Sequence, residues 1–372
     1  MRASMSSATS DQHRATEHNP LGVRAIDHLE FYVDDVEKWA DFHEEKLGLY
    51  RRAHGDASTG LEGRRAIVSG QGRVTFLFAE AQGESEKAQQ IRAFVDKHGC
   101  GVHDIAFRVD DVAHALREAE ARGATVIRPL DDQEGFTAGS IAAYGDTIHT
   151  FIHRQNTRTF APSYVDAAGG VEADDIHIMM IDHVVANVER MEEWVRFYDE
   201  VFGFEETAHF DINTGRSSLM SKVVGDTDGY IRLPINEPSS SNSQIQEFLD
   251  EFNGPGVQHI ALLTSNIIRS VNTMRERGVD FLPVPDTYYD TLLDRVGEIH
   301  ESVESLQSAK ILVDRDRVDG YLLQLFTRPV FERPTLFYEI IQRHGNSVGF
   351  GEGNFQALFE AIEREQELRG SL

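Results

Sequence analysis

Two histidines and one glutamate stand in apolar, strand-like segments in the C-terminal half of this sequence. His183 lies in IDHVV, His259 in VQHIALL and Glu339 in TLFYEII. An ionisable side chain is costly to bury among apolar neighbours unless it has a partner. Two histidines and one carboxylate are the ligand set that holds non-haem Fe(II) and leaves neighbouring coordination positions open, and zinc accepts the same ligands. We therefore predict that these three residues hold one metal ion.

Each histidine alone has an ordinary alternative, which is a core histidine hydrogen-bonded to the backbone. Glu339 is harder to explain in that way, because its neighbours in LFYEII are apolar. The metal hypothesis accounts for all three residues together.

A segment similar to the one around His183 occurs in the N-terminal half. AIDHLEFYVDDVEKWADFHEEKLGL begins at Ala25 and MIDHVVANVERMEEWVRFYDEVFGF begins at Met180, a shift of 155 residues. The same shift places His28 over His183 and Gly123 over Gly278. Agreement at one shift, from residue 25 to about residue 125, indicates a duplicated module.

The earlier copy lacks the full ligand set. The shift places Asp104 over His259, and the third element, GDTIHTFIHR, has no carboxylate within its strand. The repeat does not support a second metal site made of His28, His103 and His153. His28 with Asp104 is consistent with the remnant of a former metal site. We predict a structural first copy and one metal ion per chain.

The order of elements in each copy is a strand, a helix and then further strands. IDHLEFYV and IDHVVANV have the apolar and β-branched residues of strands. Apolar residues recur at helical spacing over 36–47, and Gly48 is predicted to end that helix. The resulting domain prediction is a disordered tail (1–20), an N-terminal structural domain (21–155), a linker (156–176) and a C-terminal catalytic domain (177–372).

The second copy carries material that the first lacks. PDTYYDTLLDRVGEIHESVESLQ and the C-terminal stretch have no counterpart in the first copy. An insertion on one copy of a repeat often marks the functional copy.

Composition excludes several classes of function. The chain has 372 residues and a net charge of −26, which argues against sequence-independent binding of nucleic acid. Its single cysteine, Cys100, excludes an internal disulfide and a zinc ribbon. No apolar run is long enough for a membrane helix, and the N-terminus resembles no secretory signal. We expect a cytoplasmic protein with no membrane partner.

The basic residues are almost all arginines. Six of the 36 basic residues are lysines, against 62 acidic residues. A protein that works in high salt would have such a surface, because screening weakens repulsion among carboxylates; an acidic protein from a GC-rich genome is the equal alternative. On the first view, the melting temperature rises between dilute buffer and molar KCl. A thermal denaturation series that shows no rise would remove this view.

Four segments of the second copy carry a resemblance to a known family. GPGVQHIALLTSNI, FLPVPDTYYDTL, GYLLQLFTRPVFERPTLFYEIIQRHG and GFGEGNFQALFEAIEREQELRG closely resemble the 4-hydroxyphenylpyruvate dioxygenases. The resemblance is dense over 177–372 and looser over the first copy. It implies an α+β fold of the vicinal-oxygen-chelate (glyoxalase-like) superfamily, in which duplicated βαβββ modules form two open β-barrel domains, here with a C-terminal helix.

The resemblance also implies a role for individual residues. His183, His259 and Glu339 match the family's Fe(II) ligands. The residues that match its substrate pocket are Ser221, Asn236, Gln244, Gln258, Gln324, Phe326, Phe337, Phe350, Asn354 and Phe355; of these Gln324, Asn236, Ser221 and Phe355 are expected to serve catalysis. Gln258 adjoins a ligand in a strand and should therefore point to the opposite face. Phe326 and Phe337 could equally be core residues on pattern alone.

The activity implied by the resemblance is the conversion of 4-hydroxyphenylpyruvate and O2 to homogentisate and CO2, a reaction of tyrosine and phenylalanine catabolism. The resemblance also implies a homo-oligomer. A hydroxymandelate synthase is the nearest alternative, although Pro234, Asn236 and Phe355 resemble the ring-hydroxylating type. The long C-terminal motif disfavours an extradiol dioxygenase. Glu339 in an apolar strand, together with the two strand histidines, disfavours a metal-free binding module.

The C-terminal stretch predicts a helix over 354–369 that acts as a gate over the metal pocket. Its apolar residues fall on one stripe, namely Phe355, Leu358, Phe359 and Ile362. Glycines at 349, 351 and 353 make the approach to this helix flexible. The ordinary alternative is a terminal helix that simply packs on the core.

Overall fold

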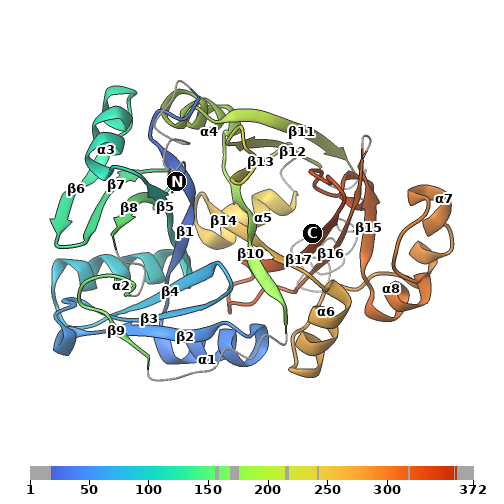
Figure 1. Cartoon of the computed structure of the whole chain (residues 1–372), viewed down its shortest axis with the longest axis horizontal. Coiled ribbons are helices and arrows are strands. Elements are labelled where there is room, and N and C mark those ends of the chain that lie inside the picture. The colour runs from blue at the N-terminus through green and yellow to red at the C-terminus, as the bar shows by residue number, and fades with distance from the viewer. Residues whose placement is uncertain are drawn as a thin grey trace, which may run out of the picture.

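The computed structural model describes residues 18–155, 159–167, 176–213, 218–240, 243–316, 319–355 and 357. Each half of the chain forms one large curved sheet, and Figure 1 shows the two sheets side by side with helices around them. The main hydrophobic cluster contains buried side chains from both halves. Among the described residues, no helix combines the length and the apolar character needed to cross a bilayer.

The N-terminal half contains nine strands and three α-helices within its described residues. The strands are β1 (Val23–Tyr32), β2 (Tyr50–Gly55), β3 (Arg64–Gln71), β4 (Val74–Ala81), β5 (Gly101–Val109), β6 (Val126–Gln133), β7 (Phe136–Ala142), β8 (Ile148–Arg154) and β9 (Val165–Asp166). The helices are α1 (Val36–Leu47), α2 (Glu86–His98) and α3 (Val112–Ala121). The predicted helix over 36–47 is confirmed, and Gly48 ends it in the left-handed conformation, with φ of 67°.

The C-terminal half has the same plan. Its strands are β10 (Ile178–Asn187), β11 (Glu205–Asn213), β12 (Ser218–Gly225), β13 (Arg232–Pro238), β14 (Gly256–Thr264), β15 (Leu312–Arg315), β16 (Tyr321–Phe326) and β17 (Phe337–His344). Its helices are α4 (Met191–Phe197), α5 (Gln244–Phe252), α6 (Ile267–Glu276), α7 (Leu292–Val296) and α8 (Val303–Ala309).

Each sheet contains two βαβββ units joined through their first strands, and the first sheet also includes β9 at its edge. The strand orders are β6-β7-β8-β5-β1-β4-β3-β2-β9 and β11-β12-β13-β10-β14-β17-β16-β15. In the second sheet β10 and β14 are antiparallel neighbours, and each pairs in parallel with the last strand of its own unit. The predicted α+β fold of duplicated βαβββ modules is confirmed, and the structure adds a second level of repetition within each copy.

The additional material of the second copy lies between α6 and β15. It forms a 3₁₀ turn at Asp286–Tyr289, then α7 and α8. The Tyr288 hydroxyl donates to Oδ1 of Asn354 over 2.6 Å, so the insertion holds the start of the C-terminal segment.

The predicted linker contributes to the first sheet. Within 156–176, residues 159–167 are described, and they include β9, which pairs with β2. Of the predicted tail, residues 1–17 lie outside the described part of the chain, and residues 18–20 lie in a turn beside β1.

Candidate active site

Three neighbouring strands bring the predicted metal ligands onto one face of the second sheet. His183 on β10 pairs with Ala261 on β14, and Ala261 pairs in turn with Glu339 on β17. His259 lies two residues before Ala261 and therefore shares its face, because side chains alternate along a strand. The small Ala261 leaves the space between His183 and Glu339 open.

A β-bulge precedes each of the two candidate histidine ligands. The pairing of β10 with β14 skips one residue between Ile181 and His183, and another between Val257 and His259. Asp182 and Gln258 are the extra residues, and a bulge re-aims the side chain that it carries. Asp182 Oδ1 lies 2.8 Å from Nδ1 of His183, and Gln258 Oε1 lies 3.2 Å from Nδ1 of His259.

The bulge overturns one expectation from the sequence. Gln258 was expected on the opposite face from His259, but it lines the same cavity because regular alternation is broken there. Each histidine thus has an acceptor at Nδ1, which leaves Nε2 to bind a metal.

The three side chains converge on one point. Glu339 Oε2 lies 3.1 Å from Nε2 of His183 and 3.7 Å from Nε2 of His259, and one possible ligand atom from each residue lies within 4.8 Å of the others. Glu339 is 3% exposed, and its Oε1 has no hydrogen-bond partner in the described part of the chain. A buried carboxylate oxygen without a partner, beside two imidazole nitrogens, fits a divalent metal ion.

The surroundings of the two histidines shift their pKa values in opposite directions. Burial acts to lower the pKa of His183, but the carboxylates of Glu339 and Asp182 outweigh it and raise that pKa above its usual value. Burial, together with the charge on His183, holds the pKa of His259 well below its usual value. His259 is therefore neutral near pH 7, as a metal ligand must be.

Arg343 connects Asp182 to the C-terminal segment. Its Nε and Nη2 donate to the two carboxylate oxygens of Asp182 over 2.8 Å each, and its Nη1 donates to the carbonyl of Gly349 over 2.6 Å. Burial acts to raise the pKa of Asp182, but hydrogen bonds from Arg343 and His183 keep it well below its usual range. Asp182 thus remains an anion that orients His183.

A largely apolar cavity adjoins His183, His259 and Glu339. It is lined by His183, Val185, Phe210, Leu219, Ser221, Pro234, Asn236, Gln244, Ile245, Gln258, His259, Phe326, Phe337, Glu339, Phe350 and Phe355. The Phe337 ring stacks on the His259 ring at 4.8 Å between centroids, and Phe350 meets the His183 ring edge-on at 5.2 Å.

Uncharged polar groups lie along one side of this cavity. Ser221 on β12 pairs with Asn236 on β13, and Asn236 pairs with Asn187 on β10. Asn236 Nδ2 donates to Oδ1 of Asn187 over 3.1 Å. Gln244 begins α5 and contributes its side chain to the same lining.

Two residues that the resemblance placed in the pocket lie outside its lining. Gln324 is fully buried beneath Gly351, and neither atom of its amide group has a hydrogen-bond partner in the described part of the chain. Asn354 is held by Tyr288 and, over 3.4 Å, by Arg295. The C-terminal segment therefore rests on Gln324, while Asn354 anchors that segment to the insertion.

Comparison with known proteins adds an independent observation. Residues 25–147 and 180–325 each match the model of the Glyoxalase/Bleomycin resistance protein/Dioxygenase superfamily. A 4-hydroxyphenylpyruvate dioxygenase from Yarrowia lipolytica is 40% identical to this chain, and the alignment covers 94% of this chain and 94% of that relative. One from Dictyostelium discoideum is 39% identical, and the alignment covers 94% of this chain and 100% of that relative. This chain belongs to the 4-hydroxyphenylpyruvate dioxygenase family.

Membership of the 4-hydroxyphenylpyruvate dioxygenase family confirms the predicted superfamily and enzyme class, and the two matched stretches begin at the repeat starts, Ala25 and Met180. A solved structure of a 4-hydroxymandelate synthase mutant from Streptomyces coelicolor has a TM-score of 0.82 at 31% identity, and the match covers 92% of this chain and 99% of that one. The fold is thus common to dioxygenases and synthases, and the roles of the individual pocket residues remain predictions.

The sequence did not point to several residues of the candidate site. Asp182 and Arg343 support His183, and Phe210 contacts both Phe350 and Phe355. The motif Ile-Asp-His occurs in both copies, and that repetition was the available signal for Asp182. Phe210 lies in a strand with no distinguishing motif.

The first copy presents a different set of groups at the corresponding positions. Asp104 replaces His259, and the pairing of β5 with β8 places Thr150 at the position of Glu339. Thr150 donates through its backbone N–H to Asp104 over 3.0 Å and also through its hydroxyl, so these groups satisfy each other. We expect His28→Ala to leave the metal content at one ion per chain, measured by elemental analysis. Loss of the metal from a variant with an unchanged circular dichroism spectrum would contradict a structural first copy.

Asp182→Asn is expected to weaken metal binding by about 10- to 100-fold, because an amide supports a ligand histidine less well than a carboxylate. Asp27→Asn is the matched control. Asp27 holds the same position in the Ile-Asp-His motif of the first copy, and it contacts His28 and two arginines. Competition against a chelator measures the affinity. Equal affinity in the two variants would remove the positioning role of Asp182.

Proposed function

We propose that this chain converts 4-hydroxyphenylpyruvate and O2 to homogentisate and CO2, with one Fe(II) held by His183, His259 and Glu339. The observation that carries the proposal is the convergence of these three side chains at an aromatic cavity with uncharged polar groups. The names of the dioxygenase relatives support the choice of substrate and reaction.

Bound Fe(II) would supply the activation of O2 and of the keto acid, since three protein ligands leave neighbouring positions free for both. The protein's part is to bind and orient the substrate and to exclude water. Phe326, Phe337 and Phe355 provide aromatic surfaces, and offset contacts between rings add about 0.5–1.5 kcal/mol beyond burial. Ser221 and Asn236 suit a phenol hydroxyl, because each can donate and accept a hydrogen bond.

The cavity is too small for the proposed substrate as it stands. Its volume is about 70 Å³, whereas an apolar cavity of about 150 Å³ holds a single benzene ring. Phe350 and Phe355 line it from the C-terminal segment, and Phe355 is half-buried. Outward movement of this segment would make room for the substrate, which supports a gate at the C-terminus. Residues 358–372, which hold most of the predicted helix 354–369, lie outside the described residues.

A 4-hydroxymandelate synthase is the second candidate function, favoured by the solved structure of that name. The deciding experiment incubates metal-free protein with 4-hydroxyphenylpyruvate and O2 after adding Fe(II) or Zn(II), and identifies the products by mass spectrometry. We expect homogentisate with Fe(II) alone. Hydroxymandelate as the sole product would favour the synthase, and equal turnover with zinc would contradict the role of iron. The homo-oligomer and the cytoplasmic location remain predictions.

A further inference from the structure

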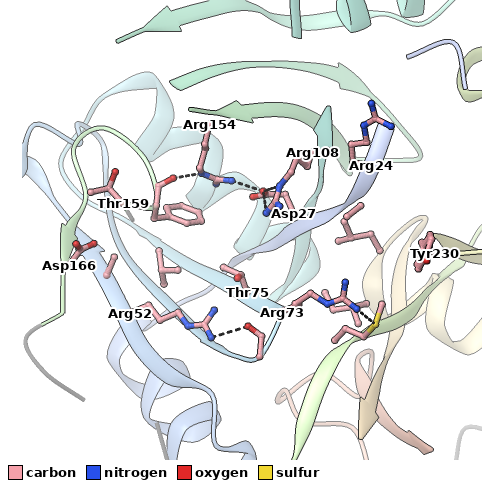
Figure 2. Close-up of a pocket in the computed structure, with 18 residues that line it drawn as sticks. Arg24, Asp27, Arg52, Arg73, Thr75, Arg108, Arg154, Thr159, Asp166 and Tyr230 are labelled. Carbon is pink, nitrogen blue, oxygen red and sulfur yellow. Dashed lines mark hydrogen bonds and ion pairs between the residues drawn. The ribbon is translucent and has the colours of Figure 1, made fainter. Parts of the chain in front are cut away.

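A second cavity, of about 400 Å³, lies where the first sheet meets β10. Most of its lining comes from the first copy, and Met180, Ile181 and Tyr230 come from the second (Figure 2). Its volume falls within the range of small-molecule sites, about 300–1,000 Å³. The lining shares no residue with the candidate active site.

Five arginines line this cavity, in a chain whose net charge is −26. They are Arg24, Arg52, Arg73, Arg108 and Arg154, and the acidic residues of the lining are Asp27 and Asp166. Figure 2 shows Arg108 and Arg154 on one side of the cavity, with Arg52 and Arg73 on the opposite side. Arginines converge in this way from four strands and a turn, although the sequence as a whole is acidic.

The acidic groups of the lining do not fully satisfy Arg154, Arg24 and Arg73. Asp27 alone accepts from both Arg108 and Arg154, and Arg24 pairs through Nε and Nη2 with Asp110, which lies outside the lining. Nη2 of Arg154 and Nη1 of Arg24 are buried and have no hydrogen-bond partner in the described part of the chain. Arg73 donates to the sulfur of Met180 over 3.0 Å, and no described carboxylate forms an ion pair with it.

Buried guanidinium N–H groups without an acceptor are costly, and an oxyanion is the ligand that satisfies them best. The planar fork of arginine matches carboxylate and phosphate groups bidentately. Thr75 and Thr159 add hydroxyl groups to the lining, and Phe160 adds an aromatic surface. A ligand with several oxyanion groups could contact arginines on both sides at once.

We propose that this cavity binds a small multivalent oxyanion, a phosphate- or carboxylate-bearing metabolite, at the junction of the two copies. Arg73, in the β3–β4 turn, and Arg52, on β2, hold it from one side, and Arg154 and Arg108, on β8 and β5, hold it from the other. The backbone N–H of Arg73 donates to the carbonyl of Met179 over 2.7 Å, so a ligand held by Arg73 would also brace the contact between the copies.

The test is isothermal titration calorimetry of the full chain with pyrophosphate and, separately, with citrate, at an ionic strength kept constant with KCl. Saturable binding at one site per chain is the expected result. Pyrophosphate binding more tightly than citrate would assign the site to phosphates, and the reverse order would assign it to carboxylates. If neither anion binds saturably, the proposal is overturned.

Arg73→Gln is the informative variant, because Arg73 lies near the surface and lacks a described carboxylate partner. It is expected to weaken binding about tenfold or more, since a charge-assisted contact is lost. Arg117→Gln, which removes an exposed arginine on α3, is the matched control and should bind like the parent. Equal weakening in both variants would show that binding depends on overall charge, and the cavity would not be the site. Circular dichroism checks that both variants are folded.

Discussion

Replacing Glu339 with glutamine is expected to remove both the bound metal and the turnover. Glu339 supplies the only carboxylate of the described metal-ligand group, and a neutral amide is a poor ligand for Fe(II). We expect metal affinity to fall by more than about 100-fold, beyond the loss caused by a supporting residue. Elemental analysis after dialysis measures the metal, and homogentisate formation measures the turnover.

Asp104→Asn is the matched control for this variant. Asp104 is a buried carboxylate at the first-copy position that corresponds to His259, and burial raises its pKa to about 6. Its replacement should leave the metal content unchanged. A full complement of metal in the Glu339→Gln protein would contradict the assignment of Glu339 as a ligand.

Glu339→Gln also separates stability from function. In the metal-free protein, Oε1 of Glu339 is buried without a hydrogen-bond partner in the described part of the chain. The other oxygen, Oε2, pairs with His183 and raises the pKa of that histidine, so removing the charge should lower the melting temperature of the metal-free protein while leaving it folded. Loss of metal accompanied by unfolding would instead point to a structural role for Glu339.

Truncation after Val348 is expected to leave the metal bound and to abolish productive turnover. All three ligands precede the cut, whereas Phe350 and Phe355 follow it and line the cavity. The truncation also uncovers Gln324 and removes the Gly349 carbonyl that accepts from Arg343. We expect homogentisate formation to fall by more than about 100-fold, because a poorly held substrate loses its reactive geometry.

Two full-length variants keep this second prediction testable if the truncated protein folds poorly. Phe355→Ala removes one aromatic surface of the cavity and should lower turnover while metal content stays at one ion per chain. Val348→Ala, at a side chain that is 65% exposed, should behave like the parent. Undiminished homogentisate formation by the truncated protein would show that the C-terminal segment is not a gate.

The sequence by itself determined the duplication, the three candidate metal ligands and the bounds of α1. The two copies share residues at a fixed shift, and that signal needs no knowledge of contacts. Glu339 was recognisable because a carboxylate among apolar strand residues requires a partner. Local signals of this kind survive in the linear order of the chain.

Only the tertiary structure decided which neighbours support those ligands. The bulges at Asp182 and Gln258 arise from the pairing of β10 with β14, two strands that are far apart in the sequence. A shift of one residue in pairing moves side chains to the other face of a sheet, so the position of Gln258 could not follow from its own strand. The arginine-lined cavity has the same origin, because its five arginines lie on four strands and a turn that come together only when the first sheet forms.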